Sequence, residues 1–153
     1  MSRTWVLVAN SAQAQLLESR ARRSDLHVTA QYSNADGRAH EGDLVTDGGA
    51  AVMERQSDGQ RRYTESQVSA REHAVDLFAI KLADVLRQGR ISNRYGELML
   101  VAPPQMLGKL RSRLDETTLR RVTQEVDKNL SKLPPDAMVA KLQDILRQHR
   151  KVI

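Results

Sequence analysis

Few residues of this sequence occur in combinations that could perform chemistry. The four histidines, at positions 27, 40, 73 and 149, are dispersed, and the chain has no cysteine, so no zinc-binding spacing arises. His40 and Glu41, followed by Asp43 and Asp47, form one loose set of metal-ligand types, although acids in a polar loop are usually solvated. Patterns typical of dinucleotide binding, P-loops, zinc proteases and serine hydrolases are absent from the sequence. We therefore predict no metal site and no cofactor, and no motif supports an enzyme.

Positive charge is concentrated toward the two ends of the chain. Of the net charge of +5, residues 1–23 and 109–153 together contribute an excess of eight positive charges, and residues 24–108 an excess of three negative ones. A basic surface built from the two ends would attract a polyanion such as RNA. Aromatic residues make up only 3% of the chain, so contact would be mainly with phosphates. The alternative is a solvated basic surface with no partner.

No segment has the composition of a signal peptide or of a membrane span. The apolar N-terminal stretch turns polar after Ala9, and no run approaches the roughly 18 apolar residues that a spanning helix needs. The absence of cysteine removes any argument for an oxidising compartment. We predict a cytoplasmic protein that does not contact a membrane.

The segment around which the chain is organised runs from Glu97 to Leu114. Its apolar run, Leu98–Ala102, predicts a central strand covered on both faces. Proline cannot donate to a sheet and suits the first turn of a helix, so Pro103 and Pro104 end the strand and open a helix. This helix has apolar residues at helical spacing, namely Met106, Leu107, Leu110 and Leu114.

Further strands are predicted at Trp5–Ala9, Ala14–Glu18 and Leu26–Tyr32, and an edge strand at Leu119–Val126, where a helix is the alternative. A final helix opens at Pro134-Pro135 with Met138, Leu142, Ile145 and Leu146 facing inward. Together these elements predict one α/β domain covering residues 1–153.

A long loop is predicted at about residues 33–65, which are polar and rich in glycine and lack hydrophobic periodicity. Loops of this length are either functional or disordered. A helix capped by Ser66 or Ser69 follows and runs to about Gln88, with Gly89 ending it. Leu77 and Ile80 lie on a second apolar patch of this helix. That patch either packs under the loop or contacts another subunit, which would make a homodimer.

Two segments resemble a known family. The stretch Thr4-Trp-Val-Leu-Val-Ala-Asn-Ser-Ala-Gln-Ala-Gln-Leu-Leu resembles the opening strand and turn of bacterial host-attachment proteins. The segment Leu98-Met-Leu-Val-Ala-Pro-Pro-Gln-Met-Leu-Gly-Lys-Leu-Arg is similar to the most specific motif of that family. Phe78-Ala79 and Val126-Asp127-Lys128-Asn129-Leu130-Ser131 also fit, so the resemblance covers nearly the whole chain.

The host-attachment family is itself similar to the middle domain of archaeal and eukaryotic class-1 peptide release factors. The resemblance implies a mixed sheet of about five strands flanked by helices. It also implies the ribonuclease H-like outline of several translation-machinery components.

In release factors, a Gly-Gly-Gln tip lies between the third strand and a long helix and reaches the peptidyl-transferase centre. Here Gly48-Gly49 is followed by Ala50, so that pair lacks the glutamine, whereas Asp58-Gly59-Gln60 keeps the last two residues. Asp58 removes the backbone freedom of paired glycines and adds a negative charge that opposes entry among RNA phosphates. We interpret Asp58, Gly59 and Gln60 as a degenerate tip.

The resemblance and the charge distribution together predict a non-catalytic cytoplasmic protein associated with the ribosome or ribosomal RNA. The candidate RNA-binding residues are Arg20, Arg22, Arg23, Arg61, Arg62, Lys109, Arg111 and Arg113. One alternative is a factor that promotes bacterial attachment to host cells, directly or indirectly. The other is an enzyme, either a peptidyl-tRNA hydrolase acting through Gln60 or a nuclease. A nuclease would need clustered carboxylates around a metal, which the sequence does not supply.

Overall fold

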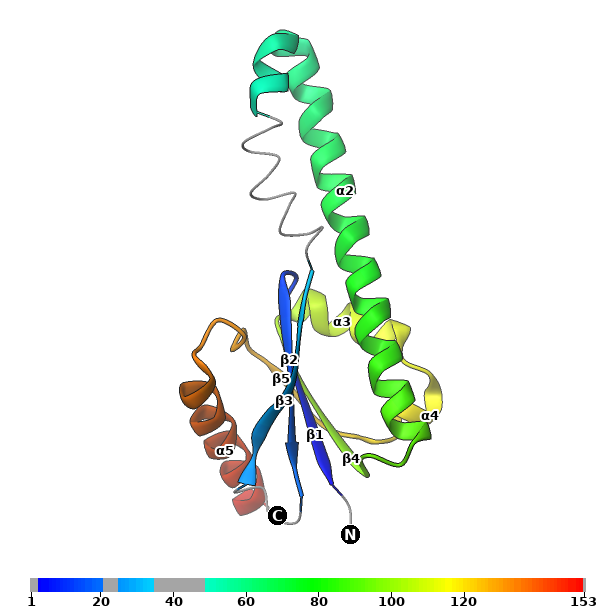
Figure 1. Ribbon diagram of the computed structural model, residues 1–153, viewed down its shortest axis with the longest axis vertical. Coiled ribbons are helices and arrows are strands. Elements are labelled where there is room, and N and C mark those ends of the chain that lie inside the picture. The colour runs from blue at the N-terminus through cyan, green and yellow to red at the C-terminus, as the bar shows by residue number, and fades with distance from the viewer. Residues whose placement is uncertain (1–2, 21–24, 35–48, 153) are drawn as a thin grey trace.

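The fold is built on a sheet flanked by helices (Figure 1), and two neighbouring strands inside this sheet are apolar along most of their length. The computed structural model describes residues 3–20, 25–34 and 49–152, and for residues 49–68 and 147–152 it describes the backbone alone. The strands are β1 (Thr4–Ala9), β2 (Gln13–Ser19), β3 (His27–Ser33), β4 (Glu97–Ala102) and β5 (Val122–Asp127). The helices are α2 (Gly49–Ile91), α3 (Pro104–Arg113), α4 (Glu116–Leu119) and α5 (Pro135–Val152).

The five strands form one mixed sheet in the order β3-β2-β1-β4-β5. The pairs β1–β2 and β2–β3 are antiparallel, and the pairs β1–β4 and β4–β5 are parallel. This topology confirms the predicted α/β class and the mixed five-stranded sheet with flanking helices. The ribonuclease H-like outline stays a prediction.

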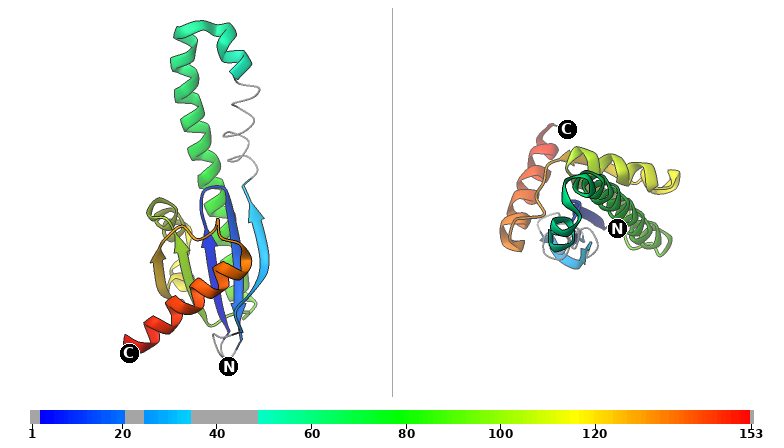
Figure 2. Two further views of the ribbon diagram at one scale, coloured as in Figure 1. Left: turned by 90° about the vertical axis from the view of Figure 1, so that its left-hand side faces the viewer. Right: turned by 90° about the horizontal axis from the view of Figure 1, so that it is seen from above.

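Helices cover both faces of the sheet, which explains why every residue of β1 and of Leu98–Ala102 is buried. On one face, Trp5, Leu7 and Leu100 pack with apolar residues of α2 and α3, including Phe78, Leu82, Leu86, Met106 and Leu110. On the other face, Val6, Val8 and Val101 pack with Met138, Leu142 and Leu146 of α5. The views in Figure 2 show α5 separated from α2 and α3 by the sheet.

The turn from β4 into α3 has the predicted form. Pro103 lies just before the helix with an extended backbone, at φ −60° and ψ 158°, and Pro104 is the first helical residue. The Leu107 amide donates to the Pro103 carbonyl at 2.9 Å, which closes the first turn. Met106 and Leu110 are buried beneath the helix. The prediction of an interior strand followed by an amphipathic helix is confirmed.

Helix α2 is longer at both ends than the sequence predicted. It has 43 residues and extends well past the sheet, and its N-terminal turns bend back from the axis of the rest of the helix (Figures 1 and 2). It begins at Gly49 and not at Ser66 or Ser69, so the loop predicted at about residues 33–65 is wrong for residues 49–65. Ser33 ends β3, and residues 35–48 lie outside the described residues.

Gly89 was predicted to end this helix but lies inside it, because α2 continues to Ile91. The helix ends where Asn93 adopts a left-handed backbone with φ 56°, and the Arg94 amide donates to the Gly89 carbonyl at 2.9 Å. Asparagine is one of the few residues other than glycine that tolerate this conformation. The signal for the helix end was therefore Asn93.

The C-terminal third departs from the predictions by a few residues. Leu119 belongs to the short helix α4, and the edge strand β5 begins at Val122. The prediction of an edge strand is confirmed, with its start corrected. Met138, Leu142 and Leu146 of α5 are buried as predicted.

Candidate nucleic-acid interface

Two of the three predicted cations of α3, Lys109 and Arg111, are held in ion pairs. Lys109 Nζ lies 2.5 Å from Asp76 Oδ1 of α2, and Arg111 Nε lies 3.4 Å from Glu125 Oε2 of β5. The hydrogen bond from Lys109 is the main cause that lowers the pKa of Asp76, and the charge of Arg113 contributes. Because carboxylates already neutralise part of this charge, α3 presents less free positive charge than its sequence indicates.

A second group of arginines lies at the end of the sheet where its three parallel strands, β1, β4 and β5, begin. Arg3 immediately precedes β1, Arg121 immediately precedes β5, and Arg94 lies in the turn that leads into β4. Arg20 follows β2, whose end lies beside the start of β1 because Ser19 is opposite Thr4. We call these four residues the arginine edge: Arg3, Arg20, Arg94 and Arg121.

Hydrogen bonds between neighbouring strands hold this edge together. The Gly96 amide donates to the Arg3 carbonyl at 2.8 Å, and the Leu98 amide donates to the Arg121 carbonyl at 2.8 Å. The strands that carry the arginine edge are consecutive in the sheet, β2-β1-β4-β5, and therefore span roughly 15 Å at the usual strand spacing. The backbone thus fixes the relative positions of the four arginines.

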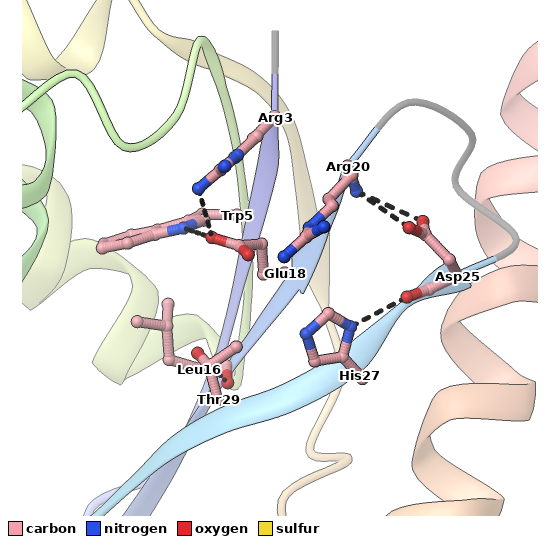
Figure 3. Close-up of polar contacts among 8 residues, drawn as sticks. All are labelled: Arg3, Trp5, Leu16, Glu18, Arg20, Asp25, His27 and Thr29. Atoms are coloured by element: carbon pink, nitrogen blue, oxygen red, sulfur yellow. Dashed lines mark hydrogen bonds and ion pairs between the residues drawn. The ribbon is translucent and has the colours of Figure 1, made fainter.

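The carboxylates at this edge accept hydrogen bonds from neutral donors of the protein itself. Glu18 Oε1 accepts from Trp5 Nε1 at 3.0 Å and lies 4.0 Å from Arg3 Nη1, between the two side chains in Figure 3. Asp25 accepts from the Ser19 hydroxyl at 2.8 Å and from the Arg20 amide at 3.2 Å. The Ser19 hydrogen bond is the main cause that lowers the pKa of Asp25. These carboxylates are therefore already occupied by the fold.

Most side chains of the arginine edge are exposed, as is Asp25, whereas Glu18 is largely buried. Arg3, Arg20 and Arg94 are exposed and Arg121 is half-buried, whereas the Glu18 side chain is only 14% exposed. Among the ion pairs between described residues, none involves Arg20, Arg94 or Arg121. These charges are therefore available to an anionic partner.

Arg20 and the cations of α3 lie over different parts of the sheet. On one flank of α2, Lys81 lies over the ring of Tyr32 in β3, with Nζ 5.9 Å from the ring centroid. On the other flank, Asp76 pairs with Lys109 of α3. Arg20 follows β2, whereas Arg111 pairs with Glu125 of β5, three strands away in the sheet order, so the structure does not bring Arg20 together with Lys109, Arg111 and Arg113.

The remaining predicted residues lie where the structure describes little or nothing. Arg22, Arg23 and the loose acidic set around His40 fall outside the described residues. Asp58, Gly59, Gln60, Arg61 and Arg62 lie within the backbone of α2, and their side chains are not described. Their catalytic and RNA-binding roles stay predictions.

Sequence reasoning missed Arg3, Arg94 and Arg121. Each precedes a strand, and the amino ends of parallel strands lie at the same edge of a sheet. The signal was thus present in the sequence, but using it required the knowledge that β1, β4 and β5 are parallel neighbours. Arg20 was found because it belongs to a visibly basic turn.

Among the described residues, no group of three or more histidine or acidic side chains could hold a metal ion. No helix there has the length and apolar character needed to cross a membrane.

Comparison with known proteins identifies the family. The family described as "Protein required for attachment to host cells" matches residues 5–142, which include all five strands apart from the first residue of β1, and most of the helical cover. A search of curated proteins finds no match to the chain. Because the family match covers far more than half of the sequence, the chain belongs to the host-attachment family.

Proposed function

We propose that this host-attachment family protein is a non-catalytic cytoplasmic protein that binds RNA, with ribosomal RNA as its partner. The observation that carries the proposal is the arginine edge, where the sheet register gathers four arginines and three of them lack an ion pair among the described residues. The resemblance to release factors supports the choice of ribosomal RNA.

Arginine is suited to this role because its planar guanidinium donates two parallel hydrogen bonds to a phosphate. The aromatic side chains beside the edge are unsuited to base stacking, since Trp5 and Tyr95 are buried and stacked on each other at 4.7 Å between ring centroids. We therefore propose contact with the sugar-phosphate backbone, which gives affinity without strong sequence preference.

The family description concerns attachment to host cells, and we propose that any such effect is indirect and follows from RNA binding inside the cell. The hydrolase and nuclease alternatives gain no support from the described residues. For the hydrolase, the residue to test is Gln60. Equal peptidyl-tRNA hydrolysis by the wild type and Gln60→Ala would exclude a role for that side chain.

The RNA proposal is tested with two variants that each lose three positive charges. In the edge variant, Arg20, Arg94 and Arg121 become Gln; in the matched control, Lys109, Arg111 and Arg113 become Gln. Fluorescence anisotropy with ribosomal RNA fragments at low salt measures the Kd, and co-sedimentation with ribosomes tests the partner. We expect the edge variant to weaken binding about tenfold or more, and the control to weaken it only a few-fold, because two of its three cations, Lys109 and Arg111, are already paired with Asp76 and Glu125.

Two outcomes would contradict the proposal. An equal loss in both variants would show that only net charge matters and that the edge is not an interface. No binding of RNA or ribosomes by the wild type at low salt would remove the function altogether.

A further inference from the structure

The outer face of α2 carries an apolar stripe that the fold leaves uncovered. Leu77, Ile80 and Ile91 are 48%, 42% and 51% exposed, and they are the large hydrophobic residues with exposed side chains in the part of the chain whose side chains are described. They lie opposite Phe78, Leu82 and Leu86, which face the sheet. Exposed apolar side chains gathered on one face indicate an interaction surface.

The spacing of this face is that of a helix that pairs with another helix. Residues His73, Leu77, Ile80, Asp84, Arg87 and Ile91 follow one another at intervals of four, three, four, three and four. This alternation is the a and d pattern of a two-helix coiled coil. We call these six residues the outer stripe. The spacing of the outer stripe therefore suits a helical partner better than an irregular peptide.

We propose that the outer stripe binds the same stripe of a second copy, with the two α2 helices antiparallel and Leu77 opposite Ile80 of the other copy. A two-fold axis repeats this contact, so the centre of the interface contains two apolar layers. One helical turn away from these layers, His73 of each copy is opposite Asp84 of the other. One turn further out, Arg87 of each copy is opposite Ala70 of the other, which is a small residue.

Charge selects this arrangement over its alternatives. Parallel pairing would place Asp84 against Asp84 and Arg87 against Arg87, and like charges opposite one another are unfavourable. An antiparallel register shifted by seven residues would place Ile80 against Asp84 and Leu77 against Arg87, so both apolar residues would meet a charge that must lose water. The proposed register is the one that joins apolar with apolar and histidine with acid.

The surface beside Ile80 has the composition of an interface margin. A groove of about 350 Å³ lies between α2 and the α3–α4 segment, with an apolar part formed by Ile80, Ala83 and Leu114 and a charged part formed by Asp84, Arg87, Arg113 and Asp115. An apolar centre with a charged rim is typical of protein interfaces. The groove gives the facing Leu77 of the second copy room beside Ile80.

The contact is short, since residues 70–87 span only about 26 Å of helix, so the two central layers dominate its affinity. Sedimentation equilibrium over a range of protein concentrations should show a monomer–dimer equilibrium. Leu77→Lys should weaken dimerisation at least about tenfold, whereas Ile91→Lys, an equally exposed residue of the same stripe outside the central layers, should change it only a few-fold. Both residues are exposed, and circular dichroism verifies that both variants fold.

Orientation is tested by disulfide formation, because the natural chain has no cysteine. A mixture of His73→Cys and Asp84→Cys should form cross-linked heterodimers under mild oxidation, and either variant alone should cross-link poorly. In the proposed register the two copies of residue 73 are about 16 Å apart along the helix, beyond disulfide reach. Strong cross-linking of His73→Cys with itself would overturn the antiparallel arrangement. A wild type that stays monomeric at all concentrations, or a dimer unaffected by Leu77→Lys, would overturn the interface.

Discussion

The indole ring of Trp5 occupies the space into which a side chain at Gly89 would project. A Cβ atom at Gly89 would lie 2.5 Å from both Cη2 and Cζ3 of Trp5 and 3.1 Å from Cε1 of Tyr95. The two rings stack with their planes inclined by 29°. The C-terminal end of α2 therefore approaches β1 closely because residue 89 has no side chain.

We predict that Gly89→Ala destabilises the protein. The added methyl group must displace the Trp5 ring, and overpacking of this kind typically costs about 1–3 kcal/mol. The higher helix propensity of alanine, worth roughly 1 kcal/mol, offsets only part of that cost. Urea unfolding measured by circular dichroism gives the free energy difference.

Gly108→Ala is the matched control, because Gly108 lies within α3 and a Cβ atom there would meet nothing within 4 Å beyond the neighbouring residues and backbone of its own helix. This change should raise stability by up to about 1 kcal/mol through helix propensity alone. If both substitutions stabilised the protein equally, the Trp5 ring would not be the constraint at position 89.

Gly89 also illustrates where the sequence was sufficient for prediction and where it was not. Glycine commonly follows the last turn of a helix, so residue 89 was a reasonable end point, but its tertiary contact with Trp5 is invisible to local patterns. The Leu98–Ala102 strand and the helix after Pro103 were predictable because apolar runs and prolines act locally. The start of α2 was missed because residues 49–65 carry little hydrophobic periodicity, since this part of the helix extends past the sheet.

The arginine edge was likewise only partly predictable from the sequence. Arg20 was predictable from its basic neighbours, but Arg3, Arg94 and Arg121 are gathered by strand register, a long-range property. Lys109 and Arg111 were predicted as free cations because their acidic partners, Asp76 and Glu125, are distant in sequence. Charge in a sequence thus indicates attraction to a polyanion, while folding decides which charges stay available.

Thr118 connects α4 to the end of α2, and we predict that Thr118→Val costs about 1–3 kcal/mol. Thr118 is fully buried; its hydroxyl donates to Asp115 Oδ1 at 2.5 Å and accepts from Arg90 Nε at 3.0 Å. Valine has the same shape but leaves Arg90 Nε without that acceptor. Thr117→Val, at an exposed neighbouring position, is the control and should change the unfolding free energy by less than about 0.5 kcal/mol.

Thr118→Val should also reduce the sensitivity of stability to acid. The Thr118 hydroxyl is the main cause that lowers the pKa of Asp115, and Arg90 contributes. A carboxyl whose folded pKa is lowered stabilises the protein above its unfolded pKa, and that contribution is lost as the pH falls through the folded value. Unfolding free energies at about pH 6 and about pH 3 should therefore differ less in the variant than in the wild type. An unchanged difference would contradict the role of this hydroxyl.

Tyr95 makes stability sensitive to alkali. Burial raises the pKa of Tyr95 to about 12, and its hydroxyl donates to the Leu86 carbonyl at 2.6 Å. The unfolded chain ionises near the ordinary value of 10, so the contribution of Tyr95 is complete below that pH and is lost as pH rises toward 12.

We predict that Tyr95→Phe removes the part of the stability loss at alkaline pH that ionisation of Tyr95 causes. At neutral pH the variant should be roughly 1 kcal/mol less stable, because it lacks the hydrogen bond to Leu86. Urea unfolding at several alkaline pH values measures the first effect. The absorbance of tyrosinate measures the ionisation directly, and the variant should lack a late-titrating group. If the titration of the folded wild type and variant differed only near the ordinary tyrosine pKa, burial would not protect this hydroxyl.

The salt dependence of RNA binding counts the phosphate contacts that the arginine edge makes. Each neutralised phosphate contributes about 0.7 to 0.9 to the slope of log K against log salt concentration, because bound counterions are released. Replacing Arg20, Arg94 and Arg121 by Gln should therefore lower the magnitude of the slope by about 2 to 3. Replacing Lys109, Arg111 and Arg113 should lower it by less than 1, since Lys109 and Arg111 already pair with Asp76 and Glu125. Anisotropy titrations at several salt concentrations measure both slopes, and a larger loss from the α3 variant would move the interface to α3.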